Sequence, residues 1–294
     1  EADESDGSFL KLPHQISIIT NLDIEHLDYY KSPENLNSAF EQFIKNLPFY
    51  GISIVNEDDK NLKKLILKND TRKIISYSNK NKNVNVYIKE VNLLQNYSEF
   101  KLKFNFPINK FSGTHLYKIK AIGLHNIYNA TASIIAGLLA GVKNSYIKSA
   151  LINYIGVKRR FTHIGKVNLS NIYDDYAHHP TEILATLKGS KQVNKNIIVV
   201  FQPHRYSRTK ILFNEFVNVL SKINRLYLLE TYSAGEKKIK GFETKDIYNK
   251  LQKLKKNVVY VRKNNLNNIV YKETYQQNII IFMGAGSISK IASN

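Results

Sequence analysis

Polar and charged side chains gather in four places along the chain, each directly after an apolar run with the length of a strand. These clusters span residues 21–28, 174–182, 202–209 and 230–236. In open parallel sheets, ligands bind at the carboxyl ends of the strands. We therefore expect the four clusters to line the binding sites of the protein.

The cluster 174–182 reads Asp-Asp-Tyr-Ala-His-His-Pro-Thr-Glu. Adjacent side chains of an extended segment point in opposite directions, so His178 and His179 are poorly placed to ligate one zinc ion together. Two interpretations remain open. The segment either contacts a nucleotide or a substrate, or it is a helix-capping turn that contains a hydrogen-bonded histidine.

The cluster 202–209 places one imidazole, His204, and two guanidinium groups, Arg205 and Arg208, after a strongly apolar run. Two arginines three residues apart can both bind a carboxylate or a phosphate through paired hydrogen bonds. The free N–H groups at the start of the following helix also favour anions. The alternative interpretation is a solvated basic turn.

Two further segments concern cations and phosphates. Glu1 and His26 offer a carboxylate and an imidazole, which suit Mg²⁺ because nucleotide-bound Mg²⁺ commonly takes only one or two protein ligands. Residues 284–290, Gly-Ala-Gly-Ser-Ile-Ser-Lys, resemble a phosphate-binding loop but lack its second glycine and the hydroxyl after the lysine. We interpret them as a turn between a strand and a helix.

The composition excludes several classes of protein. With 43 Lys and Arg against 24 Asp and Glu, the net charge is +19, but the basic residues are scattered and no base-reading motif accompanies them. No apolar run approaches the ~18 residues of a membrane span. Cysteine is absent, which fits a reducing compartment. We expect a cytoplasmic globular protein that binds neither nucleic acid nor membranes.

The order of the elements predicts an α/β fold with two domains. Strands are expected at 16–20 and 51–55, a helix at 33–47, hairpin strands at 84–88 and 102–106, and a buried helix at 123–141. Further on, strands at 196–201, 225–229, 257–261 and 278–283 alternate with helices such as 209–223. This alternation is typical of a parallel sheet. We place the domain boundary near residue 157.

The chain resembles the Mur ligases in six motifs that also occur in the family's order. They are Glu1 to Asp6, Thr20-Asn21 with His26-Leu27-Asp28, Leu124 to Ala130, Arg159-Arg160-Phe161, Asp174 to Glu182, and Gln202 to Thr209. The resemblance implies a P-loop-type central ATPase domain, truncated at its N-terminus, over 1–156. A Rossmann-like C-terminal domain with a mostly parallel sheet would follow over 157–294.

The implied activity is an ATP-dependent ligation that joins L-alanine to UDP-N-acetylmuramate through an acyl phosphate, with Mg²⁺ as cofactor, in peptidoglycan synthesis. ATP and the two substrates would be the small-molecule partners, and a second copy of the chain is a candidate partner. The phosphate loop and the UDP-binding domain are expected upstream of Glu1, so this chain alone should not perform the whole reaction. Attachment of a tripeptide in cell-wall recycling, or a non-catalytic remnant that only binds nucleotide, are the alternatives.

The resemblance also assigns roles to single residues. Glu1 and His26 would ligate Mg²⁺, Asn126 and Asn129 would contact adenine, Arg160 a phosphate, and Asp175 the ribose. Tyr176, His178, His204, Arg205 and Arg208 would face the substrate carboxylates and the incoming alanine. The implied catalytic residues are Glu1, His26, Arg160, His178 and Arg208.

Overall fold

The structure is a computed structural model that describes residues 2–68, 72–94, 97–194, 196–254 and 257–293. It divides into two compact units, Glu1–Tyr154 and Ile155–Asn294, each with its own sheet and core. Within the described part of the chain, no helix has the length and apolar character that crossing a membrane requires.

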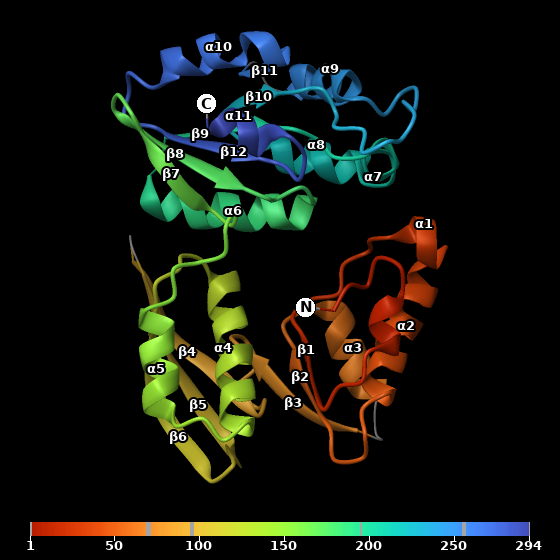
Figure 1. Ribbon diagram of the computed structural model, residues 1–294, viewed down its shortest axis with the longest axis vertical. Coiled ribbons are helices and arrows are strands. Elements are labelled where there is room, and N and C mark those ends of the chain that lie inside the picture. The colour runs from red at the N-terminus through yellow and green to blue at the C-terminus, as the bar shows by residue number, and fades with distance from the viewer. Residues whose placement is uncertain (1, 69–71, 95–96, 195, 255–256, 294) are drawn as a thin grey trace. The chain divides into compact units, whose positions relative to one another are not determined.

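The N-terminal unit is built on a six-stranded sheet with the order β1-β2-β3-β4-β5-β6 (Figure 1). Neighbouring strands from β1 to β4 are parallel, and β4, β5 and β6 pair in antiparallel fashion. Its elements are η1 (Ser8–Lys11), β1 (Ile16–Ile19), α1 (Leu27–Tyr30), α2 (Pro33–Lys45), β2 (Ile52–Asn56), α3 (Lys60–Lys68), β3 (Lys73–Ser78), β4 (Val86–Leu93), β5 (Ser98–Ile108), β6 (Phe111–Ile119), α4 (Leu124–Leu139) and α5 (Asn144–Ile152).

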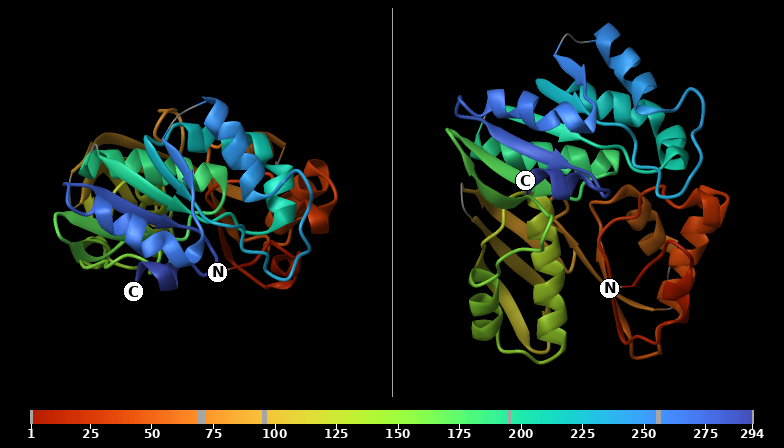
Figure 2. Two further views of the ribbon diagram at one scale, coloured as in Figure 1. Left: turned by 90° about the horizontal axis from the view of Figure 1, so that it is seen from above. Right: turned by 45° about the horizontal axis from the view of Figure 1, so that its top comes forward.

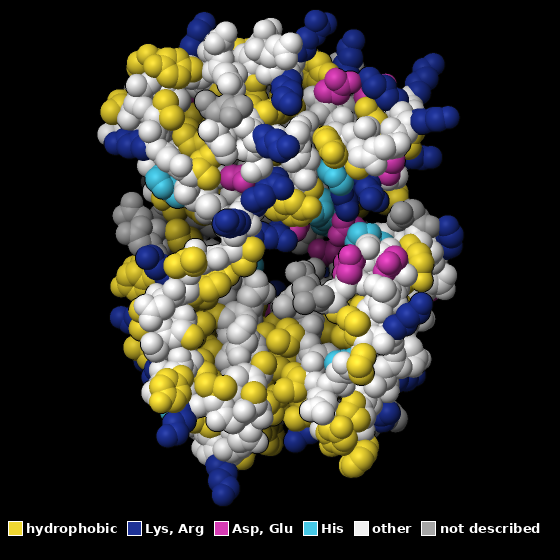
Figure 3. Space-filling view, viewed as in Figure 1, with side chains coloured by type: hydrophobic (Ala, Val, Ile, Leu, Met, Phe, Trp, Pro, Cys, Tyr) yellow, Lys and Arg dark blue, Asp and Glu magenta, His cyan; other side chains and the backbone are white. Residues whose placement is uncertain are grey.

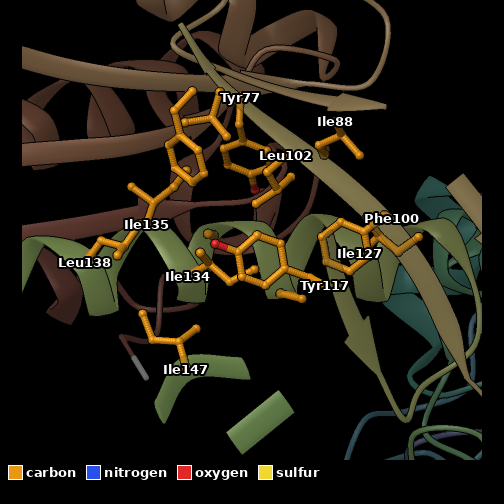
Figure 4. Packing of buried hydrophobic residues seen from close by; sticks show 14 of the residues in the cluster. Tyr77, Ile88, Phe100, Leu102, Tyr117, Ile127, Ile134, Ile135, Leu138 and Ile147 are labelled. Atoms are coloured by element: carbon orange, nitrogen blue, oxygen red, sulfur yellow. The ribbon is translucent and has the colours of Figure 1, made fainter. Parts of the chain in front are cut away.

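Alternation along the strands gives this sheet two apolar faces. In β2, Ile54 packs in the core that includes α4 and α5, whereas the next residue, Val55, packs in the core that includes α2 and α3. Figure 4 shows the first of these cores, where Tyr77 and Phe100 of the strands pack with Ile134 of α4. The sheet is therefore covered by helices on both faces.

Polar contacts tie α4 to the end of β3. Helix α4 begins after Gly123, whose φ of 100° favours glycine. One carboxylate oxygen of Asp58 accepts a hydrogen bond from the Tyr128 hydroxyl (2.7 Å), and the other accepts one from Ser78 Oγ (2.6 Å). These contacts fix the first turns of α4, which carry Asn126 and Asn129.

The C-terminal unit has a second six-stranded sheet, with the order β11-β10-β9-β12-β8-β7. All neighbouring strands are parallel except β7 and β8. Its elements are β7 (Thr162–Val167), β8 (Ser170–Asp175), α6 (Pro180–Val193), β9 (Ile197–Phe201), α7 (Tyr206–Ile211), α8 (Phe213–Ser221), β10 (Arg225–Leu228), α9 (Thr244–Leu254), β11 (Val258–Tyr260), η2 (Lys263–Asn265), α10 (Leu266–Glu273), β12 (Ile279–Met283) and α11 (Ile288–Ala292).

Helices cover both faces of this sheet as well, as Figures 1 and 2 show for α6 and α10. In β9, Val199 and Phe201 pack with α6, α8 and α9, while Ile198 and Val200 pack with α10 and α11. All five side chains of β9 are buried, as expected of a central parallel strand. The carboxyl ends of β8, β12, β9 and β10 lie side by side, and three of the four polar clusters follow β8, β9 and β10.

The predicted parallel α/β architecture is confirmed, although several elements differ from the prediction, among them the unpredicted strands β3 and β6. The expected single helix at 209–223 is two helices, because Leu212 between α7 and α8 leaves helical geometry at φ −108° and ψ 24°. The hairpin of β7 and β8 was not predicted. Strand β7 has no buried residue, so it lacks the apolar alternation that would reveal a strand in the sequence.

Candidate active-site clusters

Asp175, at the end of β8, is a buried acid that holds surrounding backbone in place. It is 3% exposed and accepts hydrogen bonds from Phe161 N (2.9 Å), Ala177 N (2.7 Å) and Thr186 Oγ1 (3.1 Å). Burial raises the pKa of Asp175 to about 6, although these donors oppose the shift. Both oxygens of this carboxylate therefore bond to groups within the C-terminal unit.

The neighbouring Asp174 joins β8 to the two ends of its unit. Ser289 Oγ donates to it at 2.6 Å, and Arg159 Nε lies 3.4 Å away. Arg159 also donates to the Gly284 carbonyl oxygen at 2.6 Å. Among the described residues, Asp174 Oδ1 and Gln202 Oε1 are buried acceptors without a hydrogen-bond partner.

Residues 178–182 form a capping box at the start of α6. His179 Nδ1 accepts from Thr181 N at 3.3 Å, and the Glu182 carboxylate accepts from the backbone N–H groups of His178 (3.0 Å) and His179 (3.2 Å). The capping interpretation is therefore confirmed for His179. Burial would raise the pKa of Glu182, but His178 and Arg160, whose Nη1 is 2.9 Å away, lower it overall.

His178 differs from His179 because its ring lies beside other predicted site residues. Its Nδ1 is 2.9 Å from the Tyr176 carbonyl oxygen, and its ring centroid is 5.2 Å from that of Tyr176 and 5.9 Å from that of His204. A carbonyl oxygen can only accept, so neutral His178 keeps its proton on Nδ1 and its lone pair on Nε2. The guanidinium carbon of Arg159 lies 4.6 Å from the Tyr176 ring centroid.

His204 is a neutral imidazole surrounded by cationic groups. Its Nδ1 is 3.2 Å from Arg208 Nη1, and its ring stacks on Tyr232 at 5.5 Å. Arginine can only donate, so Nδ1 accepts and the neutral ring carries its proton on Nε2. Burial, followed by Arg208, His178 and Arg205, lowers the pKa of His204 to about 4. The cluster thus offers N–H donors suited to an anion.

The turn after β12 packs closely against this cluster. A Cβ on Gly286 would lie 2.7 Å from Tyr232 Cγ, and one on Gly284 would lie 2.7 Å from the Gln202 carbonyl oxygen. Only glycine permits such an approach. The turn joins β12 to α11, so the interpretation of residues 284–290 as a turn between strand and helix is confirmed.

In the N-terminal unit, His26 lies among carboxylates. Its Nε2 is 3.4 Å from a Glu4 oxygen and 4.0 Å from a Glu25 oxygen, and one ligand atom from each of the three residues lies within 4.8 Å of the others. The hydrogen bond with His26 lowers the pKa of Glu4. Oxygen ligands with one imidazole suit a hard cation. Glu1, the other predicted ligand, lies outside the described residues.

Sequence reasoning did not name Glu4 or Glu25 as part of this cluster. Both belong to runs that the sequence marks as acidic, Glu1 to Asp6 and Asp23 to His26. His26 precedes α1 and adopts a left-handed conformation with φ 56°, which no pattern in the sequence indicates. The acidic runs were therefore the available clue, and the fold selects which carboxylates face the imidazole.

A pocket of about 460 Å³ lies between α4 and α5 in the N-terminal unit. Asn126 and Asn129 are among its lining residues, together with aliphatic, small and aromatic side chains. The other lining residues are Ile119, Ala130, Ser133, Ile134, Val142, Tyr146, Ile147, Ala150, Leu151 and Tyr154. Asn126 Nδ2 donates to the Ile122 carbonyl oxygen at 2.8 Å, so its amide is oriented by the backbone.

Family models match both units of the chain. The Mur ligase middle domain matches residues 2–137, and the Mur ligase glutamate ligase domain matches residues 159–286. The chain belongs to the Mur ligase family. Each unit therefore carries one Mur ligase domain, and the predicted fold class agrees with this assignment.

Curated Mur ligases resemble the chain over nearly its whole length. It is 39% identical over 293 residues to the UDP-N-acetylmuramate–L-alanine ligase of Hydrogenobaculum sp., covering 99% of this chain and 63% of that protein. The ligase of the same name from Rickettsia massiliae is 39% identical over 302 residues, covering 100% of this chain and 62% of that protein. The chain thus spans less than two thirds of these Mur ligases.

Solved structures of Mur ligases share the fold. UDP-N-acetylmuramate–alanine ligase from Thermotoga maritima superposes with a TM-score of 0.77 at 25% identity, covering 99% of this chain and 61% of that chain. A murein peptide ligase from Psychrobacter arcticus has a TM-score of 0.66 at 21% identity, over 97% of this chain and 59% of that one, which shows the fold alone.

The structure brings together most of the predicted site residues of the C-terminal Mur ligase domain, whereas in the N-terminal domain Asn126 and Asn129 line one pocket and His26 lies with Glu4 and Glu25. In the C-terminal domain, Tyr176, His178, His204 and Arg208 are linked by the ring and hydrogen-bond contacts above, and Arg205 precedes α7 in the same segment. Lysine and arginine side chains elsewhere are scattered over the face seen in Figure 3. The roles assigned to the site residues remain predictions.

Proposed function

We propose that the complete native protein joins L-alanine to UDP-N-acetylmuramate in the cytoplasm, using ATP to form an acyl phosphate that the alanine amine attacks. The observation that carries this proposal is the 39% identity along 99% of the chain with a UDP-N-acetylmuramate–L-alanine ligase. The chain spans 63% of that relative, so the proposal concerns the complete native product.

The basic segment after β9 is proposed to hold substrate carboxylates. Arg205 is exposed and Arg208 is half-buried, so both can donate to a carboxylate while the protein excludes part of the solvent. His204 adds its Nε2–H without adding charge, because its pKa is about 4. Such fixed donors orient the reactants and stabilise negative charge as it develops.

His178 is proposed to take the proton that the alanine ammonium must lose before it can attack. Its Nδ1 proton points to the Tyr176 carbonyl oxygen, at 2.9 Å, and Nε2 carries the lone pair. One ammonium proton would move to Nε2, and the freed amine would form the C–N bond as the C–O bond breaks. The departing phosphate would keep the electrons of the broken bond and take up the second proton that the nitrogen loses. Glu182, with an oxygen 3.5 Å from Nδ1, would stabilise the resulting imidazolium.

Four residues are the proposed nucleotide contacts. Asn126 and Asn129 line the pocket between α4 and α5, and their amides can both donate to and accept from adenine. The exposed Arg160 would contact a phosphate, with Glu182 orienting its guanidinium at 2.9 Å. Asp175 is the proposed ribose contact, and by accepting from Phe161 N it also fixes the backbone next to Arg160.

Glu1 and His26 are the proposed Mg²⁺ ligands, and the carboxylates of Glu4 and Glu25 beside His26 fit this assignment. Bound Mg²⁺ would offset the negative charge of the nucleotide phosphates and of the carboxylate that approaches them. His26 would contribute its neutral imidazole nitrogen. Glu4 and Glu25 would attract the cation and orient the ring.

Phosphate release by the complete native protein, with UDP-N-acetylmuramate, ATP and L-alanine, tests this function. We expect release that depends on alanine and yields ADP. Release with a tripeptide in place of alanine would instead identify the recycling ligase. ATP binding without release with either amine would identify a non-catalytic remnant, and both results would contradict the proposal.

A further inference from the structure

The basic segment 203–208 is paired along its length with a second segment, residues 232–236, that follows β10. Tyr232 N donates to the Pro203 carbonyl oxygen at 2.8 Å, and Arg205 N donates to the Tyr232 carbonyl oxygen at 2.9 Å. The His204 and Tyr232 rings stack at 5.5 Å with an interplanar angle of 11°. The second segment therefore holds the backbone on both sides of His204.

The basic segment needs this support because it turns sharply. Arg205 has a φ of 66°, in a left-handed region that residues other than glycine rarely adopt. Helix α7 starts at the next residue and has only six residues, Tyr206–Ile211. So short a helix gains little stability from its own hydrogen bonds. The position of Arg208, on this helix, thus depends on contacts from outside it.

Glu236 supplies these contacts at the first turn of α7. Its carboxylate accepts from Ser207 N at 2.9 Å through one oxygen and from Ser207 Oγ at 2.6 Å through the other. Burial would raise the pKa of Glu236, but the Ser207 and Tyr206 donors lower it overall, so the group is ionised at neutral pH. Hydrogen bonds to an ionised acceptor are about twice as strong as neutral ones.

We propose that Glu236 is a positioning residue, whose carboxylate fixes Ser207 so that Arg205 and Arg208 hold the carboxylate of the incoming amino acid. The inference rests on the function proposed above. Glu236 does not need to touch the substrate, because both of its oxygens bind Ser207, between the two arginines. Its removal would loosen both guanidinium groups together.

This role predicts an effect confined to one substrate. Asn126 and Asn129, the proposed adenine contacts, belong to the N-terminal domain. The hydrogen bonds of Glu236 within the C-terminal domain go to Ser207, not to Arg160 or Asp175, the other proposed nucleotide contacts. A general loss of folding would instead impair both substrates and lower the amount of active protein. The ratio of the two KM values therefore separates positioning from stability.

The test compares Glu236→Ala and Glu236→Gln with the wild-type complete native protein. We expect Glu236→Ala to raise the KM for alanine about tenfold, as for loss of a hydrogen bond to a charged group, and to leave the KM for ATP within about twofold. Glu236→Gln keeps an acceptor oxygen but no charge, so a rise of about threefold is expected. If Glu236→Ala does not fold, the KM for alanine of Glu236→Gln tests the proposal instead.

A matched control is Glu215→Gln, which removes the same charge from an exposed position on the next helix, α8, and should leave both KM values unchanged. An unchanged KM for alanine in both Glu236 variants would overturn the inference, as would equal increases for alanine and ATP. An inactive wild-type protein would instead refute the proposed function. We also expect faster exchange of the Ser207 amide hydrogen in Glu236→Ala, and unchanged exchange would overturn the inference as well.

Discussion

The two domains place a histidine in opposite surroundings. His26, in the N-terminal domain, lies 3.4 Å from a Glu4 oxygen and 4.0 Å from a Glu25 oxygen. His204, in the C-terminal domain, lies beside Arg208, and burial together with neighbouring cationic groups lowers its pKa to about 4. One imidazole therefore belongs to a set that attracts cations and the other to a set that attracts anions. Residue type alone does not decide what a histidine binds.

The acids of the two domains differ in the same way. Glu4 and Glu25 are partly exposed and surround an imidazole that can ligate a metal. Asp174 and Asp175 are 4% and 3% exposed, and their contacts hold the ends of their own domain together. The paired aspartates are the most conspicuous acids in the sequence. In the structure, their hydrogen bonds hold neighbouring segments of the same domain in place.

Removing Arg208, the half-buried arginine of the basic segment 203–208, should produce the largest effect. We expect Arg208→Ala to raise the KM for alanine about thirtyfold or more, since truncating one member of a partly buried charged contact costs about 2–5 kcal/mol. The KM for ATP should change little. Initial rates of phosphate release at varied alanine and ATP concentrations measure both values in the complete native protein.

Lys210→Ala is the control for this change, because it removes an exposed positive charge from the same helix, α7. That variant should behave like the wild type. If Arg208→Ala keeps the wild-type KM for alanine, the basic segment 203–208 does not bind the amino acid. The different surroundings of His26 and His204 would then not correspond to different ligands.

The buried Asp175 should make stability depend on pH. Its pKa rises from 3.8 to about 6 in the folded protein, so the folded state holds this proton more tightly than the unfolded state does. The wild type should therefore lose about 2 kcal/mol from this group as the pH rises from 4 to 7.5. Asp175→Asn lacks the titration, so the stability of the wild type relative to this variant should fall by that amount.

Urea unfolding of both proteins, followed by circular dichroism at the two pH values, measures this change. The contributions of other titrating groups cancel in the difference between the unfolding free energies of wild type and variant. A difference that does not change with pH would mean that the hydrogen bonds from Phe161, Ala177 and Thr186 offset the effect of burial. Asp175 would then resemble the exposed acids of the N-terminal domain.

Much of the fold and the location of the C-terminal cluster could be predicted from the sequence. The apolar run of β9 and the polar residues after it place His204, Arg205 and Arg208 at a carboxyl edge, since a parallel sheet collects strand ends there. The break at Leu212 could not be predicted, because the apolar pattern of the helices continues through it. Backbone geometry, not periodicity, separates α7 from α8.

The partners of each side chain were harder to predict than its position. The sequence of residues 178–182 does not indicate that His179 caps α6 while His178 lies beside His204. Glu236 is 29 residues from Ser207 in the chain, so their contact depends on the order of β9 and β10 in the sheet. Such long-range pairs come from tertiary packing, which local patterns do not encode.

The protonation state of His204 can be measured directly, and it tests whether this ring belongs to an anion-binding cluster with Arg205 and Arg208. Nitrogen-15 NMR of the imidazole should show one neutral tautomer, protonated on Nε2, from pH 8 down to below pH 5, because the pKa is about 4. Arg208, Arg205, His178 and Glu236 are the charged groups that influence it. Titration near pH 6.5, or a proton on Nδ1, would contradict the assigned hydrogen bond from Arg208.

The smallest effect is expected on the cation-binding side, where the charges are more exposed. The Glu4 side chain is 39% exposed, so solvent screens its charge, and Glu4→Gln should weaken divalent-cation binding only about threefold to fivefold. Manganese binding followed by electron paramagnetic resonance measures this affinity without requiring ligase activity.

Glu34→Gln, an exposed change in the first turn of α2, is the control for charge alone. If Glu34→Gln weakens binding as much as Glu4→Gln, general electrostatic attraction accounts for the affinity. If only Glu4→Gln does, the carboxylate acts through its contact with His26, and the two histidines are distinguished by their partners.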